Sequence, residues 1–128
     1  DPSVPVVLDT VLPVDGDRVV ADVEGMDLYR TDQQTFLIVS SQGNHSFAVV
    51  DVEPPYRYIG SFTVDPDIER GVDGAEETDG LAVASGWLTS QFSEGLLVVQ
   101  DGYNTEPTRR QNFKYVSIKD VTEGLGLK

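Results

Sequence analysis

The sequence contains no cysteine, which excludes disulfide bonds, thiolate nucleophiles and cysteine-ligated zinc or iron–sulfur centres. Basic residues are also scarce: nine lysines and arginines stand against 22 aspartates and glutamates, giving a net charge of −13. A surface of that sign repels nucleic acid and anionic lipid, because binding either one needs clustered Lys and Arg side chains. We therefore expect no nucleic-acid partner.

Long hydrophobic runs are missing as well. No stretch approaches the roughly 20 apolar residues that a transmembrane helix needs, so we expect no membrane partner. No signal-peptide pattern is present either. The 128 residues are 39% hydrophobic and 24% charged, which is typical of a globular domain with a core of its own.

What the chain does contain is a series of short apolar or alternating runs separated by Gly, Pro, Asn and Asp, the pattern of an all-β fold. Helical periodicity is weak except over Lys119–Leu125, where we expect at most a short turn of helix. The predicted strands are Val4–Leu12, Met26–Arg30, Thr35–Ser41, Ser46–Val52, Tyr56–Val64, Gly80–Ser85, Gly95–Asp101 and Asn112–Ile118.

One order of features occurs twice. An acid–Gly pair precedes an apolar strand at residues 24–25 and again at residues 79–80. In each copy a strand ending near a Gln-Gly or Gln-Asp-Gly turn follows, and then a strand containing an aromatic residue. A repeat of about four strands over roughly 40–50 residues is typical of β-propeller blades.

The repeat predicts three segments. Residues 24–78 form one four-stranded antiparallel blade, and residues 79–128 form a last blade that lacks its outer strand. Residues 1–23 supply the outer strand of a preceding blade and a linker. Propellers close with roughly four to eight blades, so we expect the other blades of the same protein to be partners of this chain.

Five motifs together resemble the β-propeller phytases. They are Ala21–Gly25, Ser40–Val49, Val72–Gly80, Gln100–Asn104 and Gln111–Lys114. The resemblance runs from about Arg18 to the end and implies about two blades of a six-bladed calcium enzyme. It also implies phytate or another inositol phosphate as substrate, hydrolysis of its phosphate monoesters, and a secreted or periplasmic location. In that family a strand from the N-terminus completes the last blade.

The resemblance also implies a site at one end of the central channel. The implied metal ligands are Glu24, Asp73, Asp79 and Asp101. Glu24 and Asp79 are also the implied catalytic residues, and Gln42 and Asn104 the implied substrate contacts. The chain departs from the family at Tyr103, where a Glu is usual, and the lost carboxylate predicts a weakly held or absent calcium ion.

Calcium reconciles an acidic protein with a substrate that is itself crowded with negative charge. The ion takes about six to eight oxygen ligands and reverses the local electrostatics. It polarises a phosphoryl group and holds a water as nucleophile. No covalent protein nucleophile is then required, which suits a chain whose Ser40 and Ser41 have no convincing base partner in the sequence.

Each of these residues also has a plainer interpretation. Acids and amides beside Gly often only shape turns, and His45 suits a hydrogen-bonding loop residue better than a catalyst. A second hypothesis for the whole protein is therefore a non-catalytic propeller that binds calcium for stability and presents loops to a protein or glycan. Tyr103 and the few basic residues favour that second hypothesis, whereas the Asp73 and Asp79 pair favours the enzyme.

Overall fold

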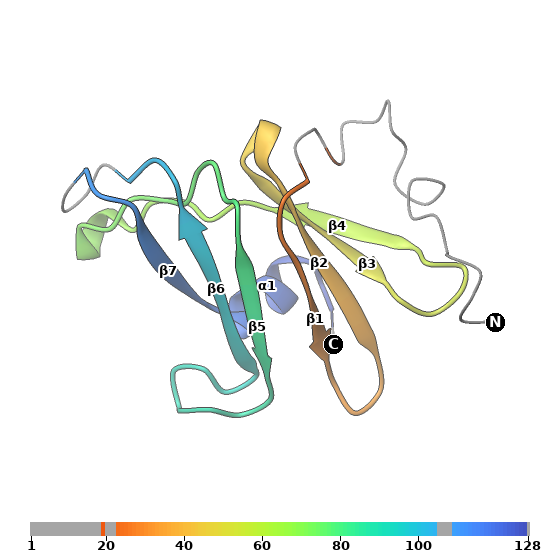
Figure 1. Cartoon of the computed structure of the whole chain (residues 1–128). Coiled ribbons are helices and arrows are strands. Elements are labelled where there is room, and N and C mark those ends of the chain that lie inside the picture. The colour runs from red at the N-terminus through yellow and green to blue at the C-terminus, as the bar shows by residue number, and fades with distance from the viewer. Residues whose placement is uncertain (1–18, 20–22, 105–108, 128) are drawn as a thin grey trace.

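The computed structural model describes residue 19 and residues 23–104 and 109–127. These residues form two antiparallel sheets and little else (Figure 1). The first sheet contains, in order, β1 (Met26–Arg30), β2 (Thr35–Ser41), β3 (Ser46–Asp51) and β4 (Tyr58–Phe62). The second contains β5 (Leu81–Ser85), β6 (Gly95–Asp101) and β7 (Asn112–Ser117), after which α1 (Ile118–Gly124) follows directly. The all-β prediction is confirmed.

The strand bounds follow the sequence pattern closely. Three predicted strands, those that became β1, β2 and β6, agree residue for residue. The strand predicted over Tyr56–Val64 is shorter, because a turn with a positive φ of 58° at Tyr56 delays its start. The strand predicted over Val4–Leu12 lies outside the described residues, and the segment boundaries at residues 24 and 79 stay predictions.

The two sheets share one hydrophobic core. Its buried members come from β1, β2 and β3 on one side and from β6 and α1 on the other. They are Tyr29, Phe36, Ile38, Phe47, Val49, Ala75, Leu97, Val99 and Ile118. Strand β3 is buried along its whole length, whereas β6 alternates between buried and half-buried residues. A strand covered on both faces is expected to be buried throughout, and a strand covered on one face is expected to alternate.

The innermost strands of the two sheets, β1 and β5, lie side by side at the centre of the molecule (Figure 1). They are joined by side chains rather than by a backbone ladder. Asp27 Oδ2 accepts a hydrogen bond from Val83 N at 2.8 Å, and Ser85 Oγ accepts one from Arg30 N at 2.9 Å. Two adjacent antiparallel sheets with their inner strands in contact are the arrangement of neighbouring propeller blades.

Gly25 shows how close this approach is. A Cβ atom placed there would lie 3.0 Å from Leu81 N and 3.1 Å from Asp79 O, so only glycine fits without a shift. The first acid–Gly pair of the repeat therefore lies against the second one. Ser40 Oγ adds a buried hydrogen bond of 2.7 Å to Thr78 O, which fixes the segment just before Asp79.

No helix among the described residues is long and apolar enough to cross a membrane.

Candidate functional site

The repeated acid–Gly pairs meet at one edge of the two sheets. Antiparallel pairing puts the start of β1 beside the end of β2, and the start of β5 beside the end of β6. Glu24 precedes β1 and Asp79 precedes β5, so both carboxylates belong to this edge, where both are exposed. We name the group of Glu24, Gln42 and Asp79 the junction.

Amide side chains hold Asp79 at the junction. Gln42, in the short 3₁₀ turn that follows β2, donates from Nε2 to Asp79 Oδ1 at 2.7 Å. Gln100, near the end of β6, accepts from Asp79 N with its Oε1 at 2.9 Å. Gln100 Nε2 in turn donates to Gln111 Oε1 at 3.2 Å. The backbone N–H and the carboxylate of Asp79 are thus both held in place. Among the described residues, no group donates a hydrogen bond to its Oδ2 atom.

The other predicted ligands gather around a lysine. Lys114 of β7 is only 6% exposed, and its Nζ lies 2.5 Å from Asp73 Oδ1 and 3.3 Å from Asp101 Oδ2. The same ammonium donates to Asn104 Oδ1 at 2.8 Å. We name these four residues the lysine cluster: Asp73, Asp101, Asn104 and Lys114.

Asp101 is held by the backbone of two loops as well as by Lys114. It is completely buried, and its Oδ1 accepts from Glu76 N at 3.2 Å and from Tyr103 N at 3.3 Å. Asn104 is 5% exposed, and its Oδ1 also accepts from Asn112 Nδ2 at 3.1 Å. These contacts bind the loop after β6 to the loop before β5.

The structure therefore sorts the six predicted site residues into two groups. Glu24, Gln42 and Asp79 lie at the junction, and Asp73, Asp101 and Asn104 lie in the lysine cluster. The sequence interpretation missed Lys114 as the centre of the second group. Strand alternation could have found it, because Lys114 falls on the opposite face of β7 from Phe113 and Tyr115, which are 66% and 67% exposed.

The junction offers the type of ligand atom that binds a hard cation, since calcium prefers carboxylate and amide oxygens. Among the described residues, no three His, Cys, Asp or Glu side chains lie close enough together to hold a metal ion. A cation at the junction thus needs further oxygens from water, substrate or the rest of the protein. In the lysine cluster, the Lys114 ammonium lies between the oxygens of Asp73, Asp101 and Asn104.

A hollow of 330 Å³ adjoins the lysine cluster at Asp73. Its walls include His45, Asp65, Asp73, Glu76 and Tyr103. His45 Nδ1 accepts from Glu77 N at 3.1 Å, as expected of a loop residue that supports the backbone. The hollow gives Asp73 a solvent-facing side, and Tyr103, 63% exposed, lies on its rim without contributing a carboxylate.

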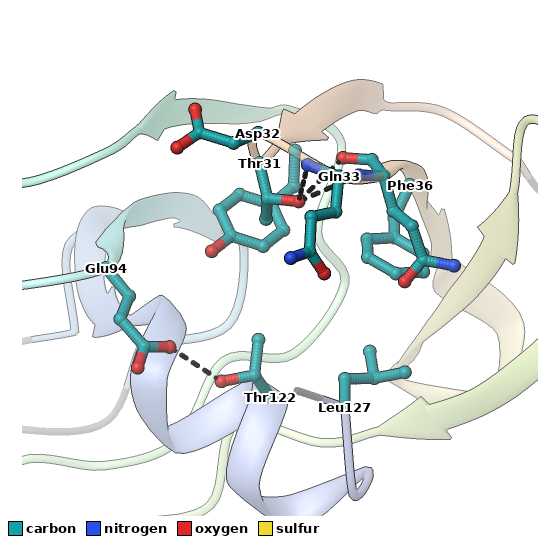
Figure 2. A pocket seen from close by; sticks show the side chains of 9 residues that line it. Thr31, Asp32, Gln33, Phe36, Glu94, Thr122 and Leu127 are labelled. Carbon is teal, nitrogen blue, oxygen red and sulfur yellow. Dashed lines mark hydrogen bonds between the residues drawn. The ribbon is translucent and has the colours of Figure 1, made fainter.

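A second hollow, of 360 Å³, lies at the opposite end of β1, where the β1–β2 turn faces α1 (Figure 2). Its walls include Tyr29, Asp32, Phe36, Glu94 and Leu127. Burial, and then the nearby Glu94 carboxylate, raise the pKa of the Tyr29 hydroxyl above its ordinary value. None of the six predicted site residues contributes to this hollow, so it is separate from the junction.

Comparison with known proteins identifies the family of the chain. The sequence model of the Phytase family matches residues 1–128. The chain belongs to the Phytase family. The predicted resemblance is thereby confirmed.

A curated relative extends the comparison. The chain is 36% identical over 114 residues to the "3-phytase" of Bacillus subtilis (strain 168). The match covers 87% of this chain and 29% of the relative, so the chain spans less than a third of that protein. Two sheets in a chain of that share agree with the predicted count of about two blades from a larger phytase propeller.

Proposed function

We propose that this chain supplies one part of the active site of a calcium-dependent phytase, which hydrolyses phosphate monoesters of inositol hexakisphosphate. The observation that supports the proposal is the junction of this Phytase-family chain, where the Gly25 backbone next to Glu24 lies against residues 79–81 and Gln42 orients the Asp79 carboxylate. The remaining blades of the same protein complete the ring and the site. A secreted or periplasmic location belongs to the same proposal.

The side chains of the junction have distinct roles in this proposal. Gln42 and Gln100 fix the rotamer and backbone of Asp79, so its carboxylate is presented to solvent in one orientation. Glu24, exposed on the neighbouring strand start, adds a second negative charge at the same edge. Two exposed carboxylates repel a phosphate, so these residues act on substrate only through a shared cation.

Calcium bound at the junction would neutralise substrate charge and present a polarised water for attack on phosphorus. The protein's part is to hold the oxygens of Glu24 and Asp79 in place before the substrate arrives. An amide group has two N–H donors, so Gln42, half-buried in the 3₁₀ turn after β2, is suited to donate to a phosphate oxygen as well as to Asp79. Asn104 is buried against Lys114 and Asn112, so we assign it to support of the loop rather than to direct substrate contact.

The test is inorganic phosphate released from phytate by the full-length protein, first with calcium and then with a chelator. We expect release that requires calcium and stops when the chelator is added. The variant Asp32→Asn serves as a matched control, because Asp32 is an exposed acid at the opposite end of β1. Release that continues unchanged in chelator would contradict the proposal.

A second function is favoured by one observation, the exposed Tyr103 where the family usually has a Glu. A calcium-binding propeller without catalysis would use such an aromatic side chain on a loop to contact a protein or glycan. The same measurement separates the two functions. The second predicts that calcium raises the midpoint of thermal unfolding while no phosphate is released.

A further inference from the structure

The lysine cluster already contains a cation, the ammonium of Lys114, which lies between the carboxylates of Asp73 and Asp101. An ammonium group has three N–H donors, and Lys114 has three oxygen neighbours, Asp73 Oδ1, Asn104 Oδ1 and Asp101 Oδ2. One positive charge thus lies between two carboxylates in a region where Lys114 and Asp101 are 6% and 0% exposed. Buried charges are tolerated only when they are paired in this way.

Most oxygens of this cluster already have a partner, and the buried Asp101 Oδ2, which makes no hydrogen bond among the described residues, has the Lys114 ammonium at 3.3 Å as its ion-pair partner. Asp101 Oδ1 receives two backbone N–H groups, and Asn104 Oδ1 receives both Lys114 and Asn112. A calcium ion needs about six to eight oxygens, several of which are usually water or carbonyl groups. A second cation about 3 Å from the ammonium would also be strongly repelled in such a buried place.

We propose that the ammonium of Lys114 is the resident cation of the lysine cluster, so that Asp73, Asp101 and Asn104 hold loops rather than calcium. The inference rests on the proposed function, because it narrows the calcium ligands of this chain to the junction residues Glu24 and Asp79. Tyr103 then occupies a position where no ligand is needed. A carboxylate at that position would add a third negative charge beside Asp73 and Asp101, which share the single ammonium of Lys114.

The junction depends on this internal ion pair. Asp73 and Asp79 belong to one loop before β5, and Lys114 fixes one end of that loop to β7. Glu76 N, in the same loop, donates to Asp101. The lysine cluster therefore sets the path along which the chain reaches Asp79, without contacting the substrate.

The first experiment measures calcium binding to the full-length protein by titration calorimetry, for the wild type and two isosteric variants. Asp79→Asn should weaken calcium binding by about tenfold or more, whereas Asp101→Asn should leave the number of bound ions and their affinity unchanged within about twofold. Loss of a calcium ion in Asp101→Asn would overturn the inference. Unchanged binding in both variants would leave the lysine cluster as inferred and remove Asp79 from the proposed calcium site.

The second experiment replaces the ammonium. Lys114→Met leaves the buried Asp101 and the half-buried Asp73 without a counter-ion, so the midpoint of unfolding in chelator should fall by roughly 5–10 °C. Added calcium should restore most of that loss, and the variant should bind an additional calcium ion in the vacated place. A purely space-filling role for Lys114 predicts no change in the number of bound ions, and that result would contradict the inference. If Lys114→Met does not fold, the Asp101→Asn titration still decides.

Discussion

The junction and the lysine cluster are built from the same kinds of residue, yet they differ in almost every physical respect. The junction has two exposed carboxylates, those of Glu24 and Asp79. Among the described residues, Gln42 is the one side chain that donates a hydrogen bond to Asp79. The lysine cluster holds two carboxylates in the interior, around an ammonium and several N–H groups. A carboxylate that keeps open lone pairs at the surface is available to a cation and a substrate, whereas a compensated one is part of the fold.

The comparison also explains the two copies of the repeat. In each, an acid–Gly pair starts the inner strand, because glycine allows the close approach that Gly25 makes to residues 79–81. Glu24 and Asp79 are thereby placed at the same edge of the two sheets. Asp101, by contrast, ends β6 with its side chain turned into the core, where only a partner such as Lys114 makes its charge acceptable.

The largest effect that we expect is on the free energy of unfolding, and it distinguishes the lysine cluster from the junction. Lys114→Met should lower the free energy of unfolding in calcium-free buffer by about 3–5 kcal/mol, because it leaves buried carboxylates uncompensated. Glu24→Gln, at an exposed position, should change it by less than about 0.5 kcal/mol. Denaturant unfolding of the full-length protein in chelator measures both. Equal losses in the two variants would remove the distinction.

The next effect separates the regions by activity. Glu24→Gln removes one of the two charges that we assign to the calcium ion, so phosphate release from phytate should fall by about 100-fold at a fixed calcium concentration. The midpoint of thermal unfolding should stay where it is. Asp32→Asn again serves as the control. Near-normal release by Glu24→Gln would take Glu24 out of the site.

A smaller effect concerns the contact that brings the two acids together. Asp27 accepts from Leu28 N with Oδ1 and from Val83 N with Oδ2, both at 2.8 Å. In Asp27→Asn the amide N–H₂ faces one of these donors, so the free energy of unfolding should fall by about 2 kcal/mol. Phosphate release should fall as well, because β1 and β5 lose a contact that holds the two sheets together. Unaltered unfolding in denaturant would show that this bond does not join the blades.

The smallest effect lies outside both regions, in the hollow of Figure 2. Because burial and Glu94 raise the pKa of Tyr29, the unfolded chain ionises first as the pH rises past about 10. The stabilisation is therefore complete below that pH and is lost above it. Tyr29→Phe should show a smaller loss of stability between pH 9 and pH 11, with Tyr115→Phe at an exposed position as the control. An identical alkaline loss in the wild type and Tyr29→Phe would contradict this.

Much of the fold was predictable from the chain alone, because the strand signals are local. Alternation and turn residues located β1, β2 and β6 to the residue, and the repeat indicated two sheets. The end of β7 was predicted one residue too late, because Ile118 begins α1 in the structure instead of ending the strand. An apolar residue at such a boundary suits either element, and only packing against the core decides.

The six candidate residues come from the sequence, and their roles stay a prediction, whereas their division into two groups comes from the structure. Sequence patterns put Asp73, Asp79 and Asp101 beside glycines alike, and nothing in those patterns says which of them is buried. That difference comes from long-range contacts, above all from Lys114, which is 41 residues from Asp73 in the chain. The clue available in the sequence was the inward position of Lys114 in a strand whose neighbouring aromatics face outward.

The most direct test of the account compares Asp79→Asn with Asp101→Asn in one assay, the ratio of phosphate release from phytate with calcium to release with chelator. We predict that Asp79→Asn loses this calcium stimulation, falling by about 100-fold or more, while Asp101→Asn keeps the stimulation and loses thermal stability instead. The opposite result, with stimulation lost in Asp101→Asn and kept in Asp79→Asn, would place the metal in the lysine cluster and contradict the account.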